Sequence, residues 1–166
     1  MNKNGCVFRR LAEMEAPQMF DLIVQRIRWM DEKGIRQWNV TGYDTAYPLE
    51  SKKEACRKGQ AFGLVDAEGR ILCAAILLEE DEYWPRDGVN ALYVHSLASR
   101  SDCPGAGAAF LRAAENYARE MGKEYLRLDS QTNNEKLSRY YIEQGFREAG
   151  ACVDGPYSGT LRQKKL

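Results

Sequence analysis

The sequence predicts an α/β fold of the mixed α+β kind, in which a central twisted, mostly antiparallel sheet is flanked by helices. Three observations favour it. Stretches with helical spacing alternate with short apolar stretches bounded by turn residues. Residues 70–78 are almost wholly apolar, as is typical of a central strand covered on both faces. Residues 91–129 read as strand, glycine-rich turn, helix and strand, which makes a βαβ-type unit.

Composition limits the class of protein. The 166 residues suit one domain, residues 1–166, with a core of its own. The 24 basic and 24 acidic residues cancel, so the chain lacks the positive field expected of a nucleic-acid or membrane-surface protein. We therefore expect neither nucleic acid nor membrane as a partner.

The cysteines and the termini indicate a compartment. Five cysteines without a Cys-x-x-Cys pair, and a single histidine, indicate neither a disulfide framework nor a metal site. Residues 1–10 lack the apolar core of a signal peptide, and no apolar run approaches the length of a membrane span. We expect a reduced, cytoplasmic protein.

The first half of the chain predicts a strand at residues 6–11 and a helix that begins near Pro17 and ends at Gly34. Residues 37–48 read as a loop that is unusually aromatic. Two interpretations of Trp38, Tyr43 and Tyr47 stay open: buried plugs, or part of a site for an acceptor. The residues expected on the buried face of the helix are Phe20, Ile23, Val24, Ile27 and Met30.

The remaining elements follow from apolar runs and turn residues. The acidic run after residue 78 is expected to be a solvated turn. The expected elements are a helix at 51–58, a hairpin of 60–66 with 70–78, a charged loop at 79–88, a strand at 91–98, and a final antiparallel pair at 147–153 and 159–164.

The glycine-rich turn predicts an anion site. Gly105 and Gly107 let the backbone approach a ligand closely, and the N–H groups at a helix start attract phosphate. A helix start that merely needs glycine to turn is the alternative, and a dinucleotide site is less favoured because the third glycine is lacking. The following helix is expected to bury Ala114, Ala118 and Met121. Glu115 and Arg119 should form an i,i+4 pair on its outer face, and Gly122 should end it.

Two motifs resemble the GNAT superfamily of N-acetyltransferases. Residues 102–107 match the glycines of its cofactor signature, and residues 134–146 resemble its Asn-x(6)-Tyr-x-x-x-Gly-Phe segment. More faintly, residues 29–38 and 93–98 look like one bacterial branch whose acceptors are mostly unassigned. The resemblance covers most of the chain and implies the GNAT-like acyl-CoA N-acyltransferase fold.

The resemblance implies that acetyl-CoA is the cofactor. Asp102 stands where the family usually has Arg or Gln, and Arg100 is the expected compensating cation. A register shifted by two residues would place Pro104 there instead. The residues expected to bind acetyl-CoA are Leu97 and Ser99 on the strand, Gly105, Ala106, Gly107 and Ala108 at the turn, and Asn134 and Tyr141 further on.

The pattern Thr132-x-x-Glu135 predicts a capping box that begins a helix at Thr132, with Asn134 in its first turn; the alternative is that Asn134 is itself a cap. Gly145 should end this helix and Phe146 should fold back on it. By resemblance Tyr141 is the candidate general acid, because a phenol can protonate a leaving thiolate.

His95 is the candidate general base, on one strand face with Tyr93 and Leu97, although a hydrogen-bonded core histidine fits equally well. Three glutamates near the end of the neighbouring strand are alternative bases: Glu79, Glu80 and Glu82.

The predicted function is transfer of the acetyl group of acetyl-CoA to a primary amine, by direct attack in a ternary complex without a metal. The aromatic loops hint at a small or apolar amine, and Trp38, Trp84 and Tyr93 are the candidate substrate-binding residues. The alternatives are a non-catalytic acyl-CoA-binding sensor and, less favoured, a nucleotide-binding module. Exposed end strands would allow a homodimer.

Overall fold

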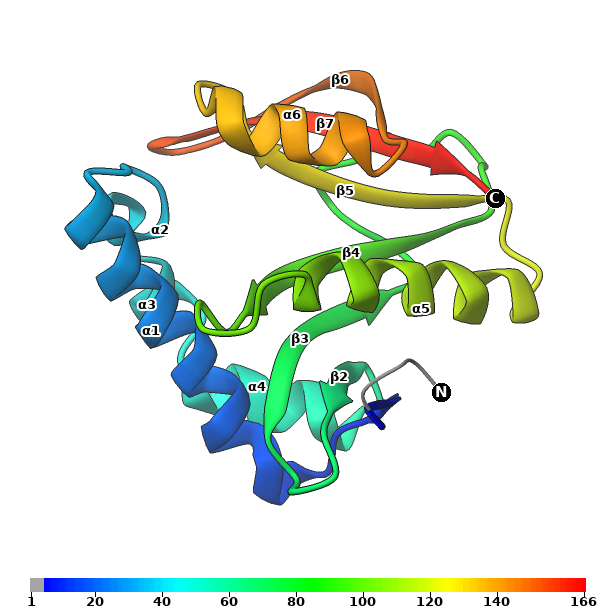
Figure 1. The fold of residues 1–166 in the computed structure, drawn as a ribbon. Helices are drawn as coiled ribbons and strands as arrows, with labels where there is room; N and C mark the ends of the chain where they lie inside the picture. Colours follow the sequence, from blue (N-terminus) through cyan, green and yellow to red (C-terminus); the bar gives the residue numbers. More distant parts are fainter. Residues whose placement is uncertain (1–4) are drawn as a thin grey trace. The chain divides into compact units, whose positions relative to one another are not determined.

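A computed structural model describes residues 5–166 and contains seven strands in the hydrogen-bonded order β1-β2-β3-β4-β5-β7-β6 (Figure 1). β4 and β5 are parallel, whereas β1–β2, β2–β3, β5–β7 and β6–β7 are antiparallel, which confirms the predicted mixed sheet. The strands are β1 (Val7–Arg10), β2 (Ala61–Val65), β3 (Ile71–Leu78), β4 (Ala91–Ser99), β5 (Tyr125–Gln131), β6 (Arg147–Asp154) and β7 (Tyr157–Lys165). The absence of a signal sequence predicted from residues 1–10 rests partly on residues 1–4, outside the described range.

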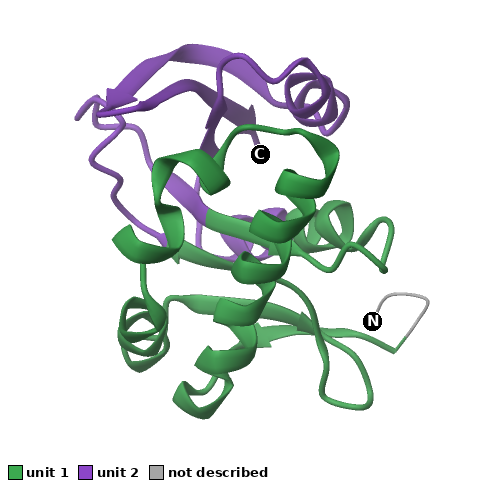
Figure 2. Ribbon diagram, turned by 90° about the vertical axis from the view of Figure 1, so that its left-hand side faces the viewer, with its two compact units in different colours: residues 1–77, 96–113 green, residues 78–95, 114–166 purple. Residues whose placement is uncertain are grey.

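The chain divides into two compact units that interleave in sequence (Figure 2). Residues 1–77 and 96–113 form the first unit, and residues 78–95 and 114–166 form the second. The first unit holds β1, β2, most of β3, the end of β4 and the beginning of helix α5 (Ala106–Glu120). Its other helical elements are η1 (Glu13–Glu15), α1 (Ala16–Lys33), α2 (Trp38–Thr41), α3 (Tyr43–Ala46) and α4 (Leu49–Arg57).

Helix α1 begins and ends as predicted, with Pro17 in its first turn and left-handed Gly34 (φ 69°) after its last residue. Its buried stripe differs from the prediction. Phe20, Val24 and Ile27 are only half-buried, because neighbouring apolar positions occupy the centre of the stripe and spacing alone does not rank them. The buried residues of α1 are Ala16, Met19, Leu22, Ile23 and Met30.

The predicted loop at residues 37–48 is wrong in part, because it contains the single-turn helices α2 and α3. The Asn39 side chain accepts a hydrogen bond from the Gln37 N–H (2.8 Å) and donates one to the Ile35 carbonyl (2.8 Å), which starts α2. Left-handed Gly42 (φ 66°) separates the two helices. The next helix, α4, begins two residues earlier than predicted.

The second unit holds the beginning of β4, then β5, β7 and β6, with helix α6 (Glu135–Glu143) and the end of α5. Two expectations for α5 are wrong. Met121 is 39% exposed, and Glu115 is only 7% exposed because it pairs with Lys164 as well as with Arg119 (3.9 Å), the predicted partner. Across the described residues, no helix is both long and apolar enough to cross a membrane.

Candidate functional site

Strand β4 is distorted just before the predicted cofactor-binding residues. Ser96 has φ 58°, in the left-handed region that residues other than glycine rarely adopt. Backbone strain of this kind typically costs about 1–3 kcal/mol and is concentrated at functional sites. Ser96 is buried, and its hydroxyl is hydrogen-bonded to the Tyr43 hydroxyl of α3. The distortion therefore marks the point where α3 meets β4.

Arg26 of α1 holds the end of β4. Its guanidinium donates hydrogen bonds to the Ser99 carbonyl (2.5 Å) and to the Ser99 hydroxyl (3.1 Å), and it stacks over the Trp29 ring at 4.7 Å. Burial lowers the pKa of Arg26 from its usual value. Sequence reasoning missed this residue, because nothing in a helical pattern distinguishes an arginine that reaches a strand end from one in solvent.

Two backbone hydrogen bonds close the turn between β4 and α5. The Cys103 N–H donates to the Arg100 carbonyl (3.3 Å) and the Ala106 N–H to the Cys103 carbonyl (3.2 Å), after which α5 begins. Gly107 and Ala108 lie in the first turn of α5, where helix geometry provides no acceptor for an N–H group. These amides, with the positive end of the helix, suit a diphosphate.

Gly105 is required for conformation, not for space. It has φ 86°, and a Cβ added there would meet nothing within 4 Å. A side chain at this position would therefore project into open space, and only the backbone conformation favours glycine.

The expected partner of Asp102 is present. The Arg100 guanidinium donates two hydrogen bonds to the Asp102 carboxylate, at 2.9 Å each. These bonds lower the pKa of Asp102, so it remains an anion whose charge Arg100 balances. The turn is therefore not left with an unpaired negative charge beside the amides.

Asn134 caps α6, which corrects the predicted start at Thr132. Its side-chain oxygen accepts a hydrogen bond from the Leu137 N–H (3.1 Å), and α6 begins at Glu135. Both candidate caps precede the same apolar pattern, and the sequence alone does not rank them. The side-chain NH₂ of Asn134 is the group that a cofactor could engage.

The other end of α6 is as predicted. Gly145 is left-handed (φ 93°), and the Phe146 N–H returns to the Tyr141 carbonyl (3.0 Å). The Tyr141 ring is buried, 5.3 Å from that of Tyr140 and 5.8 Å from that of Phe146. These rings hold Tyr141 in one orientation.

Arg162 of β7 lies buried beside α6. It donates hydrogen bonds to the Ser130 hydroxyl of β5 (2.9 Å) and to the Ser138 hydroxyl of α6 (2.9 Å), while its Nη1 has no hydrogen-bond partner in the described part of the chain. The guanidinium thereby fixes α6 on β5 and β7. Alternation on a strand predicts a buried position but not that an arginine fills it.

Arg127 organises the loop that carries Trp84. Its guanidinium lies over the Trp84 ring at 4.3 Å, pairs with Asp87 (2.8 Å) and donates to the Tyr93 hydroxyl (3.1 Å). Trp84 and Tyr93 are both 6% exposed and belong to one apolar cluster. The substrate-binding role predicted for them stays a prediction.

An acidic residue that sequence reasoning missed lies on β5. The Asp129 carboxylate accepts a hydrogen bond from the Tyr157 hydroxyl (2.5 Å). Burial raises the pKa of Asp129, and the neighbouring Asp81 adds to the rise. Burial also raises the pKa of the nearby Cys152 thiol to about 11. A carboxyl group with a raised pKa can accept a proton, so Asp129 joins His95 as a candidate base.

Comparisons with known proteins identify the fold. No family model matches the sequence. The uncharacterised N-acetyltransferase YesJ of Bacillus subtilis is 26% identical over 149 residues, which cover 85% of this chain and 81% of YesJ. A GNAT-family acetyltransferase of Listeria monocytogenes has a TM-score of 0.78 at 23% identity, with 97% of this chain and 95% of that chain covered.

The chain has the fold of the GNAT-family acetyltransferases.

Two further solved GNAT-type structures have the same fold. A GNAT-family acetyltransferase of Streptococcus agalactiae has a TM-score of 0.78 at 20% identity and covers 98% of this chain and 96% of its own. The PaiA N-acetyltransferase of Thermoplasma acidophilum, crystallised with coenzyme A, has a TM-score of 0.76 at 16% identity, with 97% and 99% covered. The predicted GNAT fold is therefore confirmed.

The predicted GNAT site residues fall into two groups, one in each unit. Trp38 is half-buried in the first unit, stacked on Tyr43 at 4.5 Å, and His95 is half-buried in the second. The first group is Trp38, Leu97, Ser99, Gly105, Ala106, Gly107 and Ala108, and the second is Trp84, Tyr93, His95, Asn134 and Tyr141. Their individual roles stay predictions.

Proposed function

We propose that this protein is a GNAT acetyltransferase, which transfers the acetyl group of acetyl-CoA to a primary amine by direct attack in a ternary complex. The turn at residues 103–108 carries this proposal, because it offers backbone amides and a helix N-terminus without a lysine or arginine in the signature position. The coenzyme A bound to the PaiA relative supports the same ligand class.

Acyl-CoA binding is assigned to backbone groups. The amides of Gly105, Gly107 and Ala108 would bind the pyrophosphate, whereas the Ala106 N–H donates to the Cys103 carbonyl and Ala106 would contribute only by its place at the helix start. The backbone of Leu97 to Ser99 would pair with the pantetheine arm like a partial strand, with Arg26 holding Ser99 in place. The cofactor supplies an activated acetyl thioester.

The proposed reaction includes two proton transfers, one from the amine nitrogen and one to the thiolate. The amine nitrogen forms a bond to the acetyl carbonyl carbon, the carbon–sulfur bond breaks, and the sulfur leaves with the electron pair as a thiolate. The nitrogen gives up one proton to a base, for which His95 and Asp129 are the candidates. The Tyr141 hydroxyl would give its proton to the thiolate, and the Asn134 NH₂ would contact the cofactor. Trp38, Trp84 and Tyr93 are assigned to the acceptor.

The test is thioester consumption. Purified protein with acetyl-CoA and a panel of primary amines should release free thiol, which a thiol reagent detects, and mass spectrometry should find the N-acetyl product. Stabilisation by acetyl-CoA in a thermal melt without thiol release on any amine would instead favour the acyl-CoA sensor. Stabilisation by NAD or ATP but not by CoA would contradict both readings.

A further inference from the structure

Lys52 of α4 is a buried cation without a counter-ion among residues 5–166. Its side chain has 0% exposure, and its Nζ has no hydrogen-bond partner within that range. A buried charged group of this kind costs several kcal/mol unless it is paired. Packing alone does not explain why a lysine occupies this buried position on α4.

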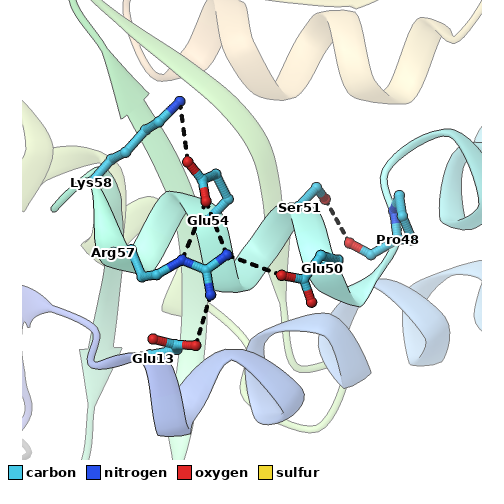
Figure 3. A network of polar contacts seen from close by, with 7 residues as sticks. All are labelled: Glu13, Pro48, Glu50, Ser51, Glu54, Arg57 and Lys58. Carbon is cyan, nitrogen blue, oxygen red and sulfur yellow. Dashed lines mark hydrogen bonds and ion pairs between the residues drawn. The ribbon is translucent and has the colours of Figure 1, made fainter.

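The acidic residues around α4 serve a different cation. The Arg57 guanidinium, on the exposed side of α4, pairs with Glu13 (2.8 Å), Glu50 (3.0 Å) and Glu54 (2.9 Å), as Figure 3 shows. Among the ion pairs of residues 5–166, none includes Lys52. The three carboxylates thus fix the helix from outside and leave Lys52 without a charge partner.

Aromatic rings cover the Lys52 ammonium. Its Nζ lies 5.9 Å from the ring centre of Tyr43 and 5.6 Å from that of Tyr47. The Trp38 ring stacks on the Tyr43 ring, with the ring centres 4.5 Å apart. Rings attract a cation but provide no hydrogen-bond acceptor. Burial lowers the pKa of Lys52 to about 8, which still leaves the ammonium form in the majority at neutral pH.

The same group of residues touches β4 on the side where an acceptor is expected. Tyr43 contacts Ser96 through their hydroxyls. Along β4, Ser96 precedes residues 97–99, assigned to the pantetheine arm, and the pyrophosphate turn follows them. Because the thioester is at the opposite end of pantetheine from the pyrophosphate, Ser96 is on the acyl side. The Tyr43–Lys52 group is therefore placed to meet the acceptor amine.

We propose that the Lys52 ammonium binds a carboxylate of the acceptor, so that the acceptor is an amino acid. This inference rests on the proposed function. The carboxylate supplies the counter-charge and the hydrogen-bond acceptor that Lys52 lacks, and charge-assisted bonds of this type are strong. Because Lys52 is fully buried, the carboxylate would have to displace the rings of Tyr43 and Tyr47, which with Trp38 would then contact the carbon skeleton of the amino acid.

The experiment compares amino acids with their decarboxylated amines. L-Phenylalanine is paired with 2-phenylethylamine and L-leucine with 3-methylbutylamine, and kcat/KM is measured for the wild type, Lys52→Met, Lys52→Arg and the control Lys53→Met. The wild type and Lys53→Met should prefer the amino acid by about 30-fold or more, Lys52→Met should lose this preference, and Lys52→Arg should keep part of it. Equal use of both members by the wild type, or an unchanged preference in Lys52→Met, would overturn the inference.

A binding measurement decides the question independently of turnover. Calorimetry with CoA present compares N-acetyl-L-phenylalanine with N-acetyl-2-phenylethylamine. The wild type should bind the carboxylated compound about 30-fold more tightly, and Lys52→Met should bind both equally weakly. If the wild type binds neither, or both alike, the inference fails even when thiol release continues. Loss of CoA binding and of thiol release would refute the proposed function instead.

Discussion

Replacement of Lys52 by methionine should stabilise the protein, and the gain should depend on pH. The side chains have similar length, and methionine carries no charge to bury. The pKa of Lys52 falls from 10.5 to about 8 on folding, and at about 1.4 kcal/mol per pH unit this difference corresponds to about 3 kcal/mol. Burial of the charge is the cause, so the cost disappears with the charge.

The direction follows from proton binding. Below pH 8 the lysine is charged in both the folded and the unfolded chain, and the full cost is present. Between pH 8 and about 10.5 the unfolded chain binds a proton that the folded chain does not, so the free energy of unfolding rises with pH. Lys52→Met should therefore exceed the wild type by about 3 kcal/mol at pH 7, reduced by the lost contacts with Tyr43 and Tyr47, the titratable side chains against Lys52.

Urea unfolding at pH 7 and at pH 10 measures this. The difference in free energy of unfolding between Lys52→Met and the wild type should be about 2–3 kcal/mol smaller at pH 10 than at pH 7. The matched variant Lys53→Met should follow the wild type at both pH values. Other groups that titrate in this range, including tyrosines, are shared by all three proteins and cancel in the comparison. An advantage that does not change with pH, or one that grows, would refute the reasoning.

Three further predictions concern the site. Tyr141→Phe should lower kcat by about 100-fold or more, with little change in the Kd for acetyl-CoA, measured by thiol release and calorimetry; an unchanged kcat would remove Tyr141 as the acid. Gly105→Ala should weaken acetyl-CoA binding and destabilise the fold by about 1 kcal/mol, because alanine is strained at φ 86°; calorimetry that finds unaltered affinity would argue against the turn as the phosphate site. Asp129→Asn should raise the urea midpoint at pH 7 and not at pH 3, because the raised pKa means that the folded chain disfavours the carboxylate; equal gains at both would contradict that cause.

The strands could be predicted from the sequence because their signals are local. The apolar run at 70–78, the hairpin turn before it and the glycines that end α1 and α6 each act within a few residues. The predicted start of α6 was wrong because local signals do not distinguish Thr132 from Asn134 as the helix cap. Long-range contact decides such choices.

The polar residues of the candidate site could not be predicted for a related reason. Arg26, Lys52 and Arg162 occupy positions where helix or strand periodicity allows either burial or exposure, and charge favours exposure. The half-buried Arg26 and the buried Arg162 are each held by a partner from a distant segment, Ser99 for Arg26 and Ser130 for Arg162. Periodicity carries no information on such pairs.

The interleaving of the two units has a practical consequence for anyone who wishes to dissect the protein. The boundaries at 77/78, 95/96 and 113/114 fall inside β3, β4 and α5, so no uninterrupted segment consists of one unit alone. A gene cut at these boundaries would encode part of a strand or part of a helix. Production of one unit for separate study would need its two segments to be co-expressed or joined in one gene.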